Sequence, residues 1–199
     1  MSGLRLLAAA TTPAMRRAVF GGDDDLDEGG LRAALALSDP DGPDLGGRAD
    51  RWVCGPSQAA LQTARALGHD DPVVEQALAD PRYGTWTGLG LGDVAGADPE
   101  GLQAWLTDPD TAVHGGESLT DLRRRVGAWL DTLAKDRTVA VAHPAVIRAA
   151  LTHALGLPDA AVWQLDVAPL SLTRLTHRTG HWHVSFPPVS RAPRAAQAE

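Results

Sequence analysis

The segment that decides the fold is VAVAHPAVIR at residues 139–148. It is typical of a buried strand that stops on a histidine and turns at once into a helix. In open α/β sheets, ligands bind at the carboxyl ends of parallel strands. We therefore expect a ligand site at His143, provided that other segments of the chain supply partners for its side chain.

Composition limits the functions that the chain can have. Of its 199 residues 44% are hydrophobic, which is enough for a sizeable core. The 18 basic and 25 acidic residues give a formal net charge of -7, whereas a nucleic-acid partner needs a basic face. Cys54 is the only cysteine, and no apolar run approaches the length of a membrane span. By elimination we expect a soluble, cytoplasmic protein with neither nucleic-acid nor membrane partners.

The order of strand-like and helix-like segments favours an α/β fold with a largely parallel sheet. Strands are predicted at 4–10, 51–54, 73–74 and 138–142, helices at 28–37, 57–67, 99–106, 118–133 and 145–155, and a closing hairpin at 170–176 and 181–186. Ser57 and Ser118 are expected to cap two of these helices. Residues 1–186 are predicted to form a single domain, and the Pro/Ala-rich residues 187–199 a flexible tail.

Residues 78–97 are rich in glycine and have little periodicity, and a long irregular stretch in a compact domain is usually functional. The sequence contains no GxGxxG or GxxxxGK[ST] phosphate loop, no nucleophile elbow and no zinc CxxC pair. We therefore expect no cofactor of those classes.

Three segments in a fixed order resemble motifs of the histidine phosphatase superfamily, whose fold is that of phosphoglycerate mutase. GPSQAALQTA at residues 55–64 resembles "SPLxRAxQTA". YGTWTGL at 83–89, followed by HGGESL at 114–119, resembles "FGxWEGL…GGES". VAHPAVIR at 141–148 resembles "VSHGGVIR". The resemblance spans Leu4 to about Phe186 and implies a three-layer α/β/α sandwich around a mostly parallel sheet.

The phosphate-handling residues of that family do not reappear here. The resemblance places the "RHGET" motif on residues 8–12, which read AAATT, so Ala9 stands at the nucleophilic histidine and Ala8 at its arginine. Ala59 stands at the helix arginine, and Asp80 at the acid glutamate. No histidine occurs before His69, so no shift of the alignment restores the nucleophile. We therefore predict a degenerate member without conventional phosphatase or mutase activity.

Several polar residues remain as candidates for a site. His143 is interpreted as a general base, a metal ligand or a relic held by hydrogen bonds, and Asp80 as a general acid that pairs with it. Candidate ligand contacts are Thr11, Thr12, Arg16, Arg82, Trp86 and Glu117. Each of these residues also has an alternative role. Thr11 and Thr12 can equally cap the end of a strand, and Glu117 can be structural. Arg82 and Asp80 can form a surface ion pair that contributes little energy. Trp86 is expected over the pocket mouth, as its family position implies. The other tryptophans are expected in the core: Trp52, Trp105, Trp129, Trp163 and Trp182.

Two classes of function stay open. The first is a pseudophosphatase that binds a small molecule or a partner in the pocket where the family binds phosphate. The second is an enzyme repurposed for acid–base chemistry with His143 and Asp80. A weaker alternative is a metal site built from His143, His114 and Glu117. Replacing a phosphate cradle by alanines makes the pocket more apolar and less cationic, which favours a less charged ligand in either class. The sequence indicates neither the ligand nor the oligomeric state.

Overall fold

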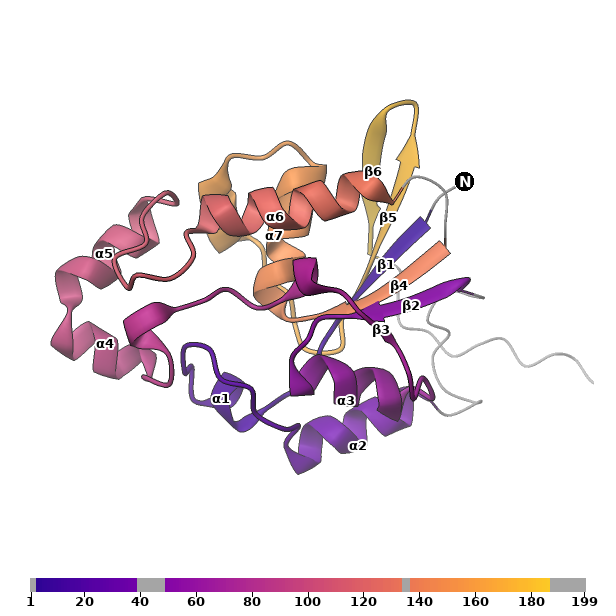
Figure 1. Cartoon of the computed structure of the whole chain (residues 1–199), viewed down its shortest axis with the longest axis horizontal. Helices are drawn as coiled ribbons and strands as arrows, with labels where there is room; N and C mark the ends of the chain where they lie inside the picture. The colour runs from indigo at the N-terminus through magenta and orange to yellow at the C-terminus, as the bar shows by residue number, and fades with distance from the viewer. Residues whose placement is uncertain (1–2, 39–48, 134–136, 187–199) are drawn as a thin grey trace, which may run out of the picture.

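The computed structural model describes residues 3–38, 49–133 and 137–186. Its elements, shown in Figure 1, are β1 (Gly3–Ala8), α1 (Pro13–Arg16), α2 (Glu28–Leu37), β2 (Arg51–Cys54), α3 (Gln58–Ala66), β3 (Val73–Val74), the 3-10 helices η1 (Gln76–Leu78) and η2 (Gly84–Trp86), α4 (Leu91–Ala97), α5 (Pro99–Thr107), α6 (Leu119–Thr132), β4 (Arg137–Ala142), α7 (Pro144–Ala154), the 3-10 helix η3 (Asp159–Gln164), β5 (Leu172–Arg178) and β6 (His181–Ser185). The predicted caps are confirmed, because the Ser57 and Ser118 side chains accept from the N–H groups of Ala60 and Asp121. The proposed tail 187–199 lies outside the described residues.

A single six-stranded sheet runs through the described chain in the order β3-β2-β4-β1-β5-β6. The pairs β2–β3, β2–β4 and β1–β4 are parallel. Strands β5 and β6 form the predicted closing hairpin, and β5 pairs antiparallel with β1. Helices α6 and α7 cover one face of the sheet, and α2 and α3 cover the other (Figure 1). The expected α/β sandwich around a mostly parallel sheet is therefore confirmed.

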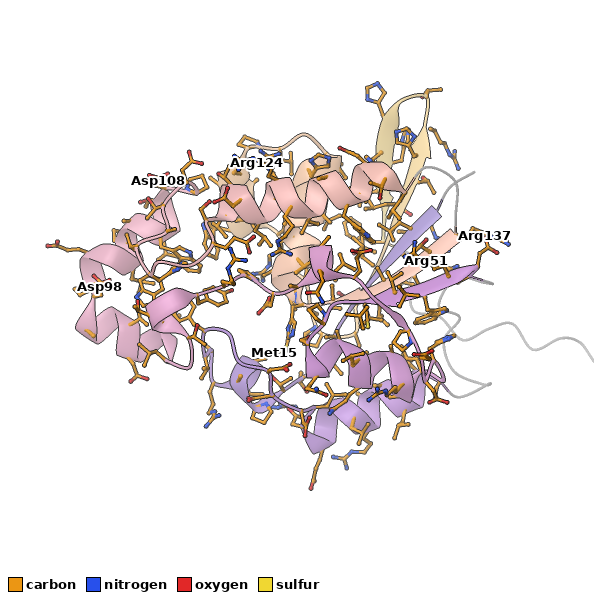
Figure 2. The ribbon with its side chains drawn as sticks, in the orientation of Figure 1. Met15, Arg51, Asp98, Asp108, Arg124 and Arg137 are labelled. Atoms are coloured by element: carbon orange, nitrogen blue, oxygen red, sulfur yellow. The ribbon has the colours of Figure 1, made fainter. Side chains whose placement is uncertain are left out.

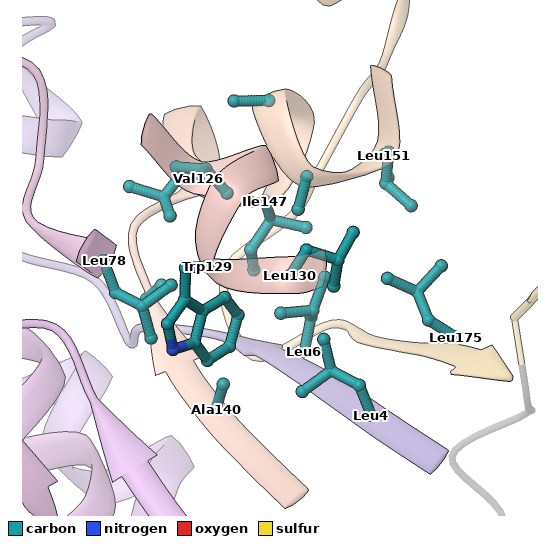
Figure 3. Packing of buried hydrophobic residues seen from close by; sticks show 14 of the residues in the cluster. Leu4, Leu6, Leu78, Val126, Trp129, Leu130, Ala140, Ile147, Leu151 and Leu175 are labelled. Carbon is teal, nitrogen blue, oxygen red and sulfur yellow. The ribbon is translucent and has the colours of Figure 1, made fainter. Parts of the chain in front are cut away.

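Alternation along the central strands builds two separate cores. On β1, Leu4 and Leu6 face α6 and α7, where they pack with Leu130 and Ile147 (Figure 3). The next residue, Leu7, points to the opposite face and joins the cluster around α3. Both central strands are thus buried on both faces, which explains why they read as continuous apolar runs rather than alternating ones.

The stretch at 78–97 is more regular than its sequence indicated. It contains η2 and α4, and Val19 pairs with Gly90 in an isolated antiparallel bridge. Short helices with several glycines, such as α4, carry too few apolar residues for a periodic signal. Among the described residues, no helix is both long and apolar enough to cross a membrane.

Candidate functional site

The parallel ladder brings two strand ends together. Ala8 lies opposite Ala142, and the N–H of Ala9 donates to the carbonyl oxygen of Ala142 over 2.9 Å. Ala9 and His143 are consequently neighbours at the edge where β1 and β4 both end. Helices α4 and α5 lie beyond that edge (Figure 1), and Met15 of α1 lies on the same side, far from Arg51 and Arg137 at the amino ends of β2 and β4 (Figure 2).

A cavity of about 530 Å³ opens at this edge, a size typical of small-molecule sites. Its walls come from α1 and the loop after it, the segment at Asp80, α5, the start of α7, and η3 with the chain that follows. The sequence-predicted residues on these walls are His143, Asp80, Thr11, Thr12 and Arg16. The fold therefore brings five of the eight candidates to one cavity.

His143 is the N-cap residue of α7, but its side chain makes no capping hydrogen bond. Its Nε2 atom is buried and has no hydrogen-bond partner among the described residues. One turn further along α7, Arg148 also lines the cavity, and its buried Nε atom has no hydrogen-bond partner in the described part of the chain either. A buried polar atom without a partner is costly, so these two groups are available for a ligand.

Asp80 lines the same cavity in a protein-enclosed position. Burial raises the pKa of its carboxyl group, while the charges of His143 and Arg125 act in the opposite direction. Arg125 also fixes the local backbone, because its Nη1 donates to the carbonyl oxygens of Ala77 (2.9 Å) and Ala79 (3.1 Å). These two hydrogen bonds fix the backbone that leads into Asp80.

Thr11, Thr12 and Arg16 reach the cavity but already have partners. Thr12 Oγ1 accepts from the N–H of Met15, so it caps α1. Arg16 Nε lies 2.5 Å from Asp27 Oδ2, and its Nη2 donates to Thr11 Oγ1 over 3.2 Å. Hydrogen bonding from Arg16 is the main reason that the pKa of Asp27 lies well below its ordinary value. The charge of Arg16 is thus neutralised within the protein.

Three predicted contact residues lie elsewhere. Trp86 does not cover the pocket mouth: it is 4% exposed and packs against Phe20 and His114. Glu117 forms a buried ion pair with Arg125, with Oε2 2.7 Å from Nη2. The Arg82 side chain is exposed, and its backbone oxygen accepts from the N–H of Glu117. The cavity walls, as formed by described residues, include none of the three.

The alternative metal site is not supported. His114 is buried, and its Nδ1 accepts from the N–H of Gly116, while Glu117 is committed to Arg125. Across residues 3–38, 49–133 and 137–186, no group of three or more His, Cys, Asp or Glu side chains is arranged to hold a metal ion. The sequence proximity of His114 and Glu117 suggested a ligand pair, but their side chains serve two different structural contacts.

The sequence analysis missed the aromatic wall of the cavity. Phe20, Tyr83, Trp105 and Trp163 all line it. Trp163, which we expected in the core, is 38% exposed. These rings come from four distant segments, and since a wall residue and a core residue are both apolar, no local signal separates them.

The end of β1 is closed by packing. Ala8, Ala9 and Ala10 are each 0% exposed, and Ala9 belongs to the cluster around α3. The N–H of Ala10 donates to Thr63 Oγ1 of α3 over 3.0 Å. On the other side, a Cβ built on Gly30 of α2 would lie 2.4 Å from the carbonyl oxygen of Thr11. Helices α2 and α3 therefore enclose the end of β1 directly.

Comparison with known proteins identifies the class. A model of the histidine phosphatase superfamily (branch 1) matches residues 9–187, so the chain belongs to this superfamily.

Individual relatives agree with that class. A bifunctional protein of Mycobacterium tuberculosis is 34% identical over 149 residues, which cover 65% of this chain and 41% of that protein. A glucosyl-3-phosphoglycerate phosphatase of Mycolicibacterium vanbaalenii is 34% identical over 113 residues and half of each chain. The chain thus spans half or less of the length of both. The solved structure of a mycobacterial glucosyl-3-phosphoglycerate phosphatase complexed with VO3 superposes with a TM-score of 0.81 at 26% identity, covering 96% of this chain and all of that one.

Proposed function

We propose that this chain is a pseudophosphatase that binds a small molecule in the cavity at the ends of β1 and β4. The observation that carries the proposal is the end of β1, where Ala8 and Ala9 are fully buried at the positions that the family resemblance assigns to the arginine and the nucleophile. Alanine can neither accept a phosphoryl group nor neutralise one. Removal of a nucleophile from a cooperative active site costs on the order of 10⁶ in turnover in subtilisin.

The charges around the cavity support the same proposal. Superfamily chemistry needs cationic donors around a multiply charged phosphate. Here Ala59 of α3 stands at the position that the resemblance assigns to the helix arginine and is buried in the cluster with Ala9, while Arg16 is paired with Asp27. His143 and Arg148 remain as donors, and they suit a ligand with little negative charge.

Phosphatase assays test the proposal directly. We expect no turnover of p-nitrophenyl phosphate above buffer and no acid-labile phosphoryl-protein after incubation with a phosphate donor. We also expect no ordered phosphate or sulfate beside Ala9 in soaked crystals. Robust turnover that His143→Ala abolishes would refute the proposal, as would an anion held beside Ala9 by Arg16 or Arg17.

A second candidate function is acid–base catalysis by His143 and Asp80. It is favoured by the shared cavity and by the burial that raises the pKa of Asp80, because a carboxyl group that titrates nearer neutrality is a better general acid. An unbiased ligand screen followed by mutation separates the two functions. If His143→Ala preserves ligand affinity but abolishes a turnover, the chain is an enzyme; if no turnover is found and the variant weakens binding, it is a binding protein.

A further inference from the structure

The aromatic wall of the cavity is continuous. Phe20 lies 5.2 Å from Tyr83 and 5.5 Å from Trp105, measured between ring centroids. Trp105 in turn meets Trp163 edge to face at 4.6 Å. All four residues line the cavity, and Trp163 is the most exposed of them at 38%, so a bound molecule meets an aromatic wall. Such a surface suits an apolar or aromatic body and attracts a cation placed over a ring face.

Two carboxylates line the same cavity, and each accepts a hydrogen bond from a backbone N–H group. Asp23 Oδ1 accepts from the N–H of Gln58 over 2.5 Å, and Asp24 Oδ2 accepts from the N–H of Ala14 over 3.1 Å. Both residues line the cavity. Each of these contacts uses one carboxylate oxygen, so among the described residues the second oxygen of each group is left as an acceptor for a ligand.

The arginines that line the cavity carry too little free positive charge to balance its carboxylates. Arg16 is bound to Asp27, which does not belong to the cavity walls formed by the described residues. Arg148 also lines the cavity, and it has no carboxylate partner among the described residues. The cavity is lined by three acidic side chains, which are Asp23, Asp24 and Asp80, so they outnumber this one unpaired cation. An anionic ligand meets repulsion at the carboxylate side of such a site, whereas an ammonium group is attracted to it.

We propose that the ligand is a small organic cation, an amine on an apolar or aromatic body, whose ammonium group binds Asp23 and Asp24 while its body lies against the aromatic wall. The inference rests on the proposed ligand-binding function and names the chemical class of that ligand.

Three probes with one indole body and different charges test the inference: tryptamine (cationic), tryptophol (neutral) and indole-3-propionate (anionic). We expect calorimetric titration of the whole chain to give the tightest binding for tryptamine, by roughly tenfold over tryptophol, and the weakest for indole-3-propionate. Asp24→Asn is expected to remove most of that preference, because an amide oxygen still accepts from the N–H of Ala14 but carries no charge.

Asp25→Asn is the matched control. Its carboxylate lies on the same loop and accepts from Gln62 Nε2, and Asp25 is not a wall residue among those described. The preference for tryptamine should survive it. Asp23→Asn repeats the test if Asp24→Asn does not fold.

Three outcomes overturn the inference: equal binding of tryptamine and tryptophol, a preference that survives both Asp23→Asn and Asp24→Asn, or no binding of any indole. The first two leave small-molecule binding intact. The proposed function fails separately, through turnover of p-nitrophenyl phosphate.

Discussion

The ends of β1 and β4 lie side by side and have opposite character. Both strands are central, buried and parallel, and each leads into a helix with proline at its start, Pro13 in α1 and Pro144 in α7. Yet β1 ends on buried alanines whose backbone is bound by Thr63, whereas β4 ends on His143, whose Nε2 has no hydrogen-bond partner in the described structure. One end is packed into the core, and the other borders the cavity. The difference teaches that two neighbouring strand ends of one sheet can have opposite surroundings, because packing decides which of them stays open.

The largest expected effect concerns the contact that holds Asp80 beside the end of β4. Arg125→Met should destabilise the protein by about 3 kcal/mol, because it leaves buried Glu117 unpaired and releases the carbonyl groups of Ala77 and Ala79. Urea denaturation measures the loss. The control Arg124→Met breaks only an exposed pair with Asp121 and should change stability by less than about 0.5 kcal/mol. Equal losses in the two variants would show that Arg125 is not a structural support.

Placing a histidine at Ala9 tests whether the end of β1 is closed by packing. Ala9→His should cost about 1–3 kcal/mol, because the larger ring must enter the packed cluster around α3. It should also yield no phosphatase activity, since Ala8 and Ala59 supply no cation. Chemical denaturation and p-nitrophenyl phosphate turnover are the measurements. A stable Ala9→His protein that turns over the ester would mean that the end of β1 is still an open active site.

The pH dependence of the free energy of unfolding reports on Asp80, which lines the cavity at the end of β4. Its folded-state pKa is raised by burial, so as pH rises above about 4 the unfolded chain loses this proton first. The native state then binds more protons than the unfolded state, and the Asp80 contribution to stability falls until pH passes the folded-state pKa. Asp80→Asn removes this titration and should therefore gain stability relative to the parent as pH rises from 4 to 7. Parallel stability curves for the two proteins would contradict the raised pKa.

The smallest expected effect is that of removing the unpartnered ring. His143→Ala should change the free energy of unfolding by less than about 1 kcal/mol, because the Nε2 atom has no hydrogen bond to lose. His114→Ala should cost more, since that ring is buried, accepts from the N–H of Gly116 and packs against Trp86. Thermal denaturation compares the two variants. If His143→Ala lowers the free energy of unfolding more than His114→Ala does, His143 has a structural role rather than a ligand-binding one.

The sequence by itself determined the α/β class and the absence of any histidine before His69, and it predicted a site at His143, which does line the cavity. These features depend on local apolar runs and on residue identity, which a linear chain displays directly. From the order of motifs, the sequence also predicted that Asp80 lies in the same site as His143. Both residues do line one cavity.

Only the tertiary structure decided what surrounds that site. Glu117 was predicted as a ligand contact and is instead committed to Arg125, and Trp86 is covered by other rings. Conversely, Trp163 was expected in the core and lies on the cavity wall. Whether a polar or aromatic side chain meets a ligand or another residue depends on packing between distant segments. A sequence pattern specifies which face of a helix or strand is apolar, but not which partner that face will meet.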